Sequence, residues 1–452
     1  MLAGFEDVLW WLVLIGVMIN LHELGHFWAA RYFDVKVEAF SFGFGLRLFG
    51  FRRGETDYRV SLIPFGGYVK MAGEQFGDGT TAGTEAAEAH RDDPRYLLSK
   101  PRWQRLIIAF AGPFMNIVLA VGVLTGLYMV KYQKVSDADM EAVIGHVVAD
   151  SPAAKAGIAD GDRIVRMDGK VNPTWEDVGL KEMAGAYRQM HLTILRNGKT
   201  FDTTVTPTLS DRTGVGYAGW DERGQIQLSQ IEHDMPADKA GLKPGDLIVA
   251  LNGQPIHSVV KFQEITKNSG GQPIHVQFQR NGATNEVTVR PVYAKIDGPA
   301  RWMIGVIPQP KLDFITTRLS FPEALGQSVR ENAKGAMLMG EFIKGLVERR
   351  MSTKNLAGPI GIAVQTGEAA RQGPSVFFMW MGMVSLQLAI VNLLPIPILD
   401  GGVILMLLVE MVMQRDLSLN VKEAVFKVGF VCIMLILVFT IYNDISKILP
   451  AG

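Results

Sequence analysis

Two histidines and a glutamate near the start of the chain have the spacing of a metal-binding motif. His22 and His26 are four residues apart, so in a helix both imidazoles project from one face and can reach the same ion. Neutral histidine nitrogens are preferred zinc ligands, and Glu23 is placed to accept a proton from a water molecule that the metal activates. These residue types predict a hydrolytic metal site.

The surroundings of the motif favour a metal site over a soluble helix with two surface histidines. Residues 8–21 are apolar apart from Asn20, and residues 27–30 continue the apolar run. A segment of this kind is typical of a helix that crosses a membrane. Two histidines and a carboxylate are costly in lipid unless they have a function or a partner, so we expect a ligand for them.

A tetrahedral zinc site needs a further protein ligand, and Asp400 is the candidate. It closes a run that begins at Asn392 and contains Pro395 and Pro397, which cannot both lie inside a regular helix. The run is therefore predicted to be partly unwound, as membrane proteins tolerate where the backbone lines a water-filled cavity. Alone, Asp400 would also fit a helix cap at the membrane edge, but the histidines favour a ligand.

Four segments are apolar and long enough to cross a membrane: residues 5–32, 106–130, 376–398 with a continuation toward 413, and 424–442. Lysine and arginine gather after the first segment, before the second and between the last two, and such residues mark the cytoplasmic side. This distribution predicts that residues 33–103 and 414–423 are cytoplasmic. Both termini and residues 131–375 are then predicted to lie outside.

Between the first two segments, the alternation of apolar and polar residues predicts a β-hairpin. Apolar residues alternate with small or polar ones from Phe40 to Leu48, Arg53 and Gly54 give a turn signal, and residues 58–62 alternate again. So many aromatic residues beside a membrane helix suggest a hairpin that dips into the membrane surface. An ordinary cytoplasmic hairpin fits the pattern equally well.

The region between the second and third segments contains an internal repeat with a constant offset of 84 residues. The motif Pro-Ala-x-x-Ala-Gly begins at Pro152 and again at Pro236, and Gly-Asp-x-Ile begins at Gly161 and again at Gly245. This pattern resembles the PDZ domains associated with bacterial proteases, which accept an extended peptide on a sheet edge. A spacer or steric filter that binds no peptide is the alternative.

These features predict a polytopic α-helical membrane protein with four transmembrane helices, a membrane-associated β-hairpin and two inserted PDZ-like α+β domains. The zero net charge gives no indication of nucleic-acid binding, and a single cysteine, Cys432, excludes an intrachain disulfide. The expected parts are a membrane core at 1–130 with the hairpin region at 33–103, PDZ-like domains at 131–214 and 215–310, a helical membrane-surface linker at 311–375, and the remaining core at 376–452.

The histidine motif of the first segment and the Asn392-to-Asp400 run of the third together resemble the site-2 protease family of intramembrane zinc metalloproteases. The inserted PDZ-like pair is similar to that of bacterial members. The resemblance implies one zinc ion per chain, bound by His22, His26 and Asp400, with Glu23 as the catalytic base.

The resemblance extends to residues beyond the metal ligands. It implies that Gly43, Phe44 and Gly45 of the hairpin contact the substrate, and that Asn392 helps to hold the substrate or the transition state. From the residues alone, Asn392 could equally be an amide that satisfies the unwound backbone. Asn116, in a glycine-proline break of the second segment, is expected to pack between helices.

The same resemblance implies hydrolysis of a peptide bond within the transmembrane segment of single-pass membrane proteins, in regulated intramembrane proteolysis and envelope stress signalling. The implied substrates are a pre-trimmed anti-sigma factor and remnant signal peptides, in the inner membrane of a bacterium. The active site would face the cytoplasm, and the PDZ-like domains and both termini the periplasm. There are two alternatives. The first is a membrane-anchored scaffold with an inactive core, and the complete set of site residues argues against it. The second is a metal transporter, and the convergence of these residues on one site argues against that.

Overall fold

The structure is a computed structural model that describes residues 2–73, 93–135, 141–210, 213–295, 300–311, 313–353 and 356–448. The chain forms two compact units. One comprises Met1–Tyr132, Arg318–Gly340 and Leu356–Gly452, and the other comprises Gln133–Thr317 and Glu341–Asn355. Part of the expected hairpin region, residues 74–92, lies outside the described residues.

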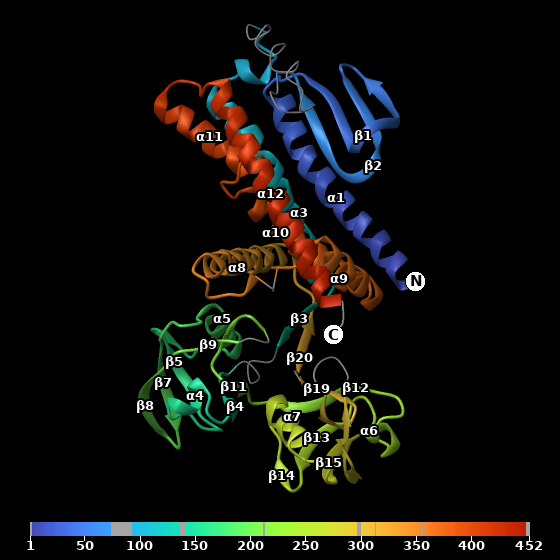
Figure 1. Cartoon of the computed structure of the whole chain (residues 1–452), viewed down its shortest axis with the longest axis vertical. Coiled ribbons are helices and arrows are strands. Elements are labelled where there is room, and N and C mark those ends of the chain that lie inside the picture. Colours follow the sequence, from blue (N-terminus) through green and yellow to red (C-terminus); the bar gives the residue numbers. More distant parts are fainter. Residues whose placement is uncertain are drawn as a thin grey trace. The chain divides into compact units, whose positions relative to one another are not determined.

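Long apolar helices make up most of the first unit (Figure 1). Its helical elements are α1 (Leu2–Tyr32), the short 3-10 helix η1 (Leu97–Ser99), α3 (Arg102–Val130), the first part of α8 (Phe321–Val347), α9 (Pro359–Gln372), α10 (Pro374–Asn392), α11 (Asp400–Met413) and α12 (Leu419–Ile448). Among the described residues, four stretches are long and apolar enough to cross a membrane: Gly4–Tyr32, Arg102–Val130, Pro374–Asn392 and Asn420–Lys447. They correspond to the four segments expected from hydropathy. Helix α3 is central, because it packs against α1, α10 and α11.

The third apolar segment is interrupted instead of continuing as one helix toward residue 413. Helix α10 ends at Asn392, residues 393–399 are not helical, and α11 starts afresh at Asp400. Pro395 and Pro397 lie within the interruption, where they cost no helical hydrogen bonds. The predicted unwinding therefore separates two helices and places Asp400 at the start of the second.

Strands β1 (Val37–Arg53) and β2 (Thr56–Met71) pair in a sheet that folds back on itself. Residues 49–53 pair with 56–60 across the turn that Arg53 and Gly54 predict, but β2 then continues beyond residue 62. Its last part, residues 67–71, returns to pair with 37–42. The two outer edges of the sheet are consequently residues 49–53 and 67–71.

The second unit contains two copies of one α+β arrangement, in the order that the internal repeat predicts. The first copy contains β4 (Ile144–Val147), α4 (Pro152–Lys155), β5 (Arg163–Met167), β6 (Lys170–Val171), α5 (Trp175–Ala184), β7 (Met190–Arg196), β8 (Lys199–Val205), β9 (Thr208–Leu209), β10 (Gly216–Tyr217) and β11 (Trp220–Glu222). The second contains β12 (Gln225–Ile231), α6 (Pro236–Lys239), β13 (Leu247–Leu251), β14 (Gln254–Pro255), α7 (Val259–Lys267), β15 (Ile274–Arg280), β16 (Ala283–Val289), β17 (Val292–Ala294), β18 (Arg301–Met303) and β19 (Val306–Lys311).

Each copy has its own apolar core and repeats the same ion pair between an arginine and a buried aspartate. Arg196 contacts Asp162 at 2.6 Å in the first copy, and Arg280 contacts Asp246 at 2.7 Å in the second. Both aspartates are 1% exposed, and each stands at the same place in its copy, just before β5 and just before β13. The repeated sequence thus corresponds to repeated structure.

The first copy extends further along the chain than expected. Strand β11 pairs with β4, and Ala218 and Trp220 belong to the first core, whereas the second core begins at Ile226. The copies therefore divide between residues 222 and 225 instead of at 214. The linker expected to be helical from residue 311 likewise begins with a strand, β20 (Phe314–Thr317), which pairs with β3 (Tyr132–Val135).

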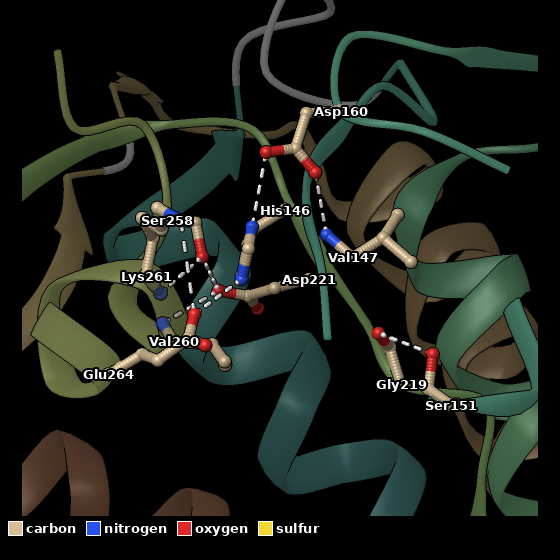
Figure 2. A network of polar contacts seen from close by, with 10 residues as sticks. All are labelled: His146, Val147, Ser151, Asp160, Gly219, Asp221, Ser258, Val260, Lys261 and Glu264. Carbon is tan, nitrogen blue, oxygen red and sulfur yellow. Dashed lines mark hydrogen bonds and ion pairs between the residues drawn. The ribbon is translucent and has the colours of Figure 1, made fainter. Parts of the chain in front are cut away.

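Figure 2 shows the polar contacts that join the two copies. His146 of β4 contacts Asp160 of its own copy (Nδ1 to Oδ2, 3.1 Å) and Glu264 on α7 of the other (Nε2 to Oε2, 2.8 Å). Asp221 of β11 accepts hydrogen bonds from Ser258 Oγ at 2.6 Å and from a backbone N–H in the first turn of α7 at 3.1 Å. The first copy therefore holds the N-terminal end and one face of α7.

Candidate metal centre

Three potential metal ligands converge between α1 and α11. His22 Nε2 lies 3.1 Å from Asp400 Oδ2, His26 Nε2 lies 3.4 Å from Asp400 Oδ1, and the two Nε2 atoms are 3.2 Å apart. The three ligand atoms all lie within 4.8 Å of one another, and both histidines are buried. The structure thus brings together the three residues that the sequence predicts as ligands.

The hydrogen bonding of His26 shows which of its nitrogens faces this cluster with a lone pair. Its Nδ1 lies 2.7 Å from the carbonyl oxygen of Ile108, and a carbonyl can only accept a hydrogen bond. His26 must therefore carry a proton on Nδ1, and in the neutral ring the lone pair of Nε2 is then directed at His22 and Asp400. Lone pairs and a carboxylate that point at one another are favourable around a cation, so the donor set fits a zinc ion.

Helix α3 leaves space beside both histidine nitrogens because residue 112 is glycine. A Cβ atom at Gly112 would lie 2.2 Å from His26 Nε2 and 2.8 Å from His22 Nε2. Such an atom would occupy the space that the two nitrogens face. This open space beside the nitrogens is a second observation that fits an ion at this position.

The broken segment before α11 determines where the third ligand lies. Asp400 is the first residue of α11, and its N-cap residue, Leu399, makes no side-chain capping bond. A Cβ at Gly401 would lie 2.3 Å from the Leu394 carbonyl oxygen, and one at Gly402 would lie 2.3 Å from that of Ile396. The two glycines therefore let the first turn of α11 pack closely against the unwound chain, so Asp400 can reach the histidines.

A cavity of about 800 Å³ adjoins the cluster within the first unit. Its walls include Glu23, Asn392 and residues 68–71 at the outer edge of β2, besides the three ligands. Gly67, just before this segment, lies beside the glutamate, since a Cβ there would be in van der Waals contact with Glu23 Cγ at 3.6 Å. The predicted base, the predicted asparagine and a sheet edge thus share one cavity with the metal cluster.

The motif Gly43-Phe44-Gly45 does not line this cavity and occupies the bend of the sheet instead. Both glycines have positive φ angles, +85° and +87°, and a Cβ at Gly43 would lie 2.4 Å from the Ile63 carbonyl oxygen. The Phe44 ring stacks on that of Tyr68 with centroids 6.0 Å apart. The motif therefore contacts the cavity wall through Tyr68, and residues 68–71 are the strand segment that sequence reasoning missed.

Asn116 lies beside the metal cluster, although the sequence predicted only a role in helix packing. It is fully buried, and its side-chain amide lies 3.2 Å from Nδ1 of His22. In the sequence, Asn116 follows Gly112 by four residues, so both lie on one face of α3. This spacing is the signal that could have pointed to it.

Comparisons with known proteins show the family to which the chain belongs. The model of peptidase family M50 matches residues 10–436. A regulator of sigma-E protease from Salmonella typhimurium is 31% identical, covering 98% of this chain and 100% of its own length. The regulator of sigma-E protease of Escherichia coli is 29% identical over 99% of this chain, and a putative zinc metalloprotease of Vibrio cholerae is 29% identical over 98%, both matched over 100% of their own length.

Among solved structures, a PDZ domain from Listeria monocytogenes covers 19% of this chain and 85% of its own, with 20% identity and a TM-score of 0.17, which is too weak a likeness to bear on the fold. The family match over most of the chain and the full-length relatives define the class: the protein is a metalloprotease. More narrowly, the chain belongs to peptidase family M50. The class and the family predicted from the paired motifs are confirmed.

Proposed function

We propose that the protein is a site-2 type intramembrane zinc protease with one zinc ion per chain, bound by His22, His26 and Asp400. The observation that carries this proposal is the convergence of these three side chains, two of which belong to a helix apolar enough to span a membrane. The zinc metalloprotease name of the Vibrio relative supports the choice of metal. Histidine and carboxylate ligands in a hydrolytic site also favour zinc.

Zinc in this site would supply Lewis acidity for the activation of water and the polarisation of a peptide carbonyl. Glu23, half-buried in the cavity wall, accepts the proton of the attacking water and later returns it to the departing amine. Asn392, on the same wall, donates hydrogen bonds to the substrate chain or to the developing oxyanion. Both roles are supported by the shared cavity.

A transmembrane substrate must be unwound before its peptide bonds become accessible, and the edge of β2 offers it backbone partners. Residues 68–71 form an outer edge of the sheet and line the cavity, so an unwound segment can add there as a strand. Large apolar side chains on this sheet are exposed, among them Leu46 (75%), Phe49 (63%) and Phe51 (64%). Their exposure supports a sheet that dips into the membrane surface.

The substrates we propose are single-pass membrane proteins that have already lost their outer domain, namely a trimmed anti-sigma factor and remnant signal peptides. The relatives named regulators of sigma-E protease support this class and an envelope stress response. In this proposal the protein lies in a bacterial inner membrane with both termini in the periplasm. The two copies of the second unit are periplasmic PDZ-like domains that filter substrates by size and can bind peptides, and the active site faces the cytoplasm.

The test compares wild-type protein with Glu23→Gln in detergent. Bound zinc is measured by elemental analysis, and cleavage is measured on a single-pass model substrate trimmed to a short outer stub. Glu6→Gln, an exposed glutamate on the same helix, is the matched control. We expect zinc in all three proteins and cleavage in the wild type and the control only, because glutamine cannot accept the proton.

Two outcomes contradict the proposal in different ways. Cleavage by Glu23→Gln would exclude this glutamate as the base. Zinc without cleavage in any of the three proteins would favour a membrane-anchored scaffold.

A further inference from the structure

We infer that Asn116 is a positioning residue that holds His22 in the tautomer able to bind the metal. Its side-chain oxygen accepts a hydrogen bond from His22 Nδ1, so the lone pair of His22 Nε2 faces the metal position. The inference rests on the proposed zinc site and concerns a residue on α3, which contributes no metal ligand.

The geometry places Asn116 where it can act on His22 alone. Its side chain is 0% exposed, and its Nδ2 atom lies 3.2 Å from His22 Nδ1. Its Oδ1 atom is buried and has no hydrogen-bond partner. The two ends of an amide have nearly the same shape, so a half-turn of the group brings Oδ1 to Nδ1 without repacking.

The chemistry of a neutral imidazole decides between the two amide orientations. Such a ring carries one N–H, so a free lone pair on Nε2 requires a proton on Nδ1 and an acceptor facing it. If Nδ2 of Asn116 donates instead, the His22 proton sits on Nε2 and points at Asp400 Oδ2, 3.1 Å away, where it competes with the metal. Only the orientation in which Oδ1 accepts is compatible with zinc binding.

The surroundings of Asn116 hold its side chain 3.2 Å from His22 Nδ1. Ser385 of α10, itself 0% exposed, donates a hydrogen bond of 2.9 Å to the backbone carbonyl of Asn116. Gly112, one turn earlier on the same face of α3, borders both histidine nitrogens. The equivalent partner of His26 is the backbone carbonyl of Ile108, which no side-chain substitution removes. The orientation of His22 therefore depends on a side chain that mutation can test.

The experiment measures zinc affinity by chelator competition on the full-length, detergent-solubilised chain with four substitutions. Asn116→Asp keeps an acceptor, whereas Asn116→Leu keeps only the approximate size and Asn116→Ala removes the group. Thr125→Val, a buried polar residue further along α3, is the matched control. We expect Asn116→Asp and the control to stay within about threefold of wild type, and Asn116→Leu and Asn116→Ala to bind zinc roughly 10- to 100-fold more weakly, as is typical when a partner of a metal ligand is lost.

The outcomes separate this inference from the proposed function. Wild-type affinity in both Asn116→Leu and Asn116→Ala overturns it, as does a loss in Asn116→Asp as large as in Asn116→Leu, which would mean that the donor or the packing matters. Thermal unfolding of the zinc-free proteins identifies any variant that fails to fold, and the remaining variants then decide. Absence of zinc binding in the wild type would overturn the proposed site together with this inference.

Discussion

Gly112 shows how a single missing side chain can make room for a metal site. A Cβ at this position would come within 2.8 Å of both histidine Nε2 atoms. We predict that Gly112→Ala lowers zinc affinity by at least about 100-fold and abolishes cleavage, because the methyl group occupies the space of the ion. Elemental analysis and cleavage of the trimmed substrate measure the two effects.

The same helix supplies matched controls for this prediction. Gly122 and Gly126 are also helical glycines of α3, and a Cβ at either position meets no atom within 4 Å. Alanine at these positions should leave zinc and cleavage unchanged. If all three alanine variants retained zinc equally, the ion would have to bind elsewhere.

At the scale of elements, the two outer edges of the β1–β2 sheet differ in what they face. Residues 68–71 line the active-site cavity, whereas residues 49–53 at the opposite edge do not. We predict that, of two variants with a single proline at Val69 or at Lys70, one cleaves about tenfold or more slowly. The backbone N–H groups of an edge strand point alternately into the sheet and outward, so one of the two prolines removes an outward N–H. Zinc content should stay at the wild-type level.

The opposite edge provides the comparison for the proline variants. Proline placed singly at Phe51 and at Arg52, which pair with Tyr58 and Asp57, also perturbs an edge strand of this sheet. These two variants should cleave as the wild type does. Equal cleavage by all four variants would exclude strand addition at residues 68–71.

A contact between helix α5 and strand β11 makes the stability of the first copy depend on pH. Glu182 of α5 accepts hydrogen bonds from the Ala218 N–H at 2.6 Å and from the Trp220 indole N–H at 2.8 Å. Burial, with a smaller contribution from the neighbouring charge of Asp221, raises the pKa of Glu182 from 4.5 to about 7, even though the two hydrogen bonds lower it. The folded copy therefore takes up a proton near pH 7, whereas the unfolded chain does so only near its ordinary value.

The sign of the effect follows from this difference in proton uptake. Between about pH 4.5 and pH 7 the folded state binds the extra proton, so stability is highest at the acidic end and falls as the pH rises, by at most about 1.4 kcal/mol per pH unit. Hydrogen exchange of residues 216–222, corrected for the intrinsic rate at each pH, should report less protection at pH 7.5 than at pH 5.5. Glu182→Gln should remove this difference, and a difference that persists in the variant would assign it to another group.

At the scale of the whole molecule, the second unit is proposed to exclude substrates that still carry an outer domain. We predict that deletion of residues 135–307 permits cleavage of the untrimmed substrate, because the steric filter is gone. The trimmed substrate should be cleaved by both the intact and the shortened protein, which controls for loss of the active site. Continued resistance of the untrimmed substrate would contradict the filter.

The sequence by itself determined the local features of this protein. A histidine pair four residues apart, two prolines that interrupt a helix, four apolar segments of membrane length and a repeat of constant offset are each readable over a short stretch of chain. Their agreement with one family predicted the class of enzyme, the spans and the three residues that converge on the metal centre. Periodicity and residue chemistry are local properties, so no tertiary contact was needed to read them.

Contacts between residues distant in the sequence were decided only by the tertiary structure. Nothing local indicates that residues 67–71 return to pair with 37–42 and border the cavity. The spacing of Gly112 and Asn116 places both on one face of α3, but it does not indicate that this face meets His22, 94 positions away. The pairing of β11 with β4, which moves the boundary between the copies past residue 222, is hidden for the same reason. Such contacts depend on which surfaces come together when the helices and strands pack. A short stretch of a single sequence does not determine which surfaces these are.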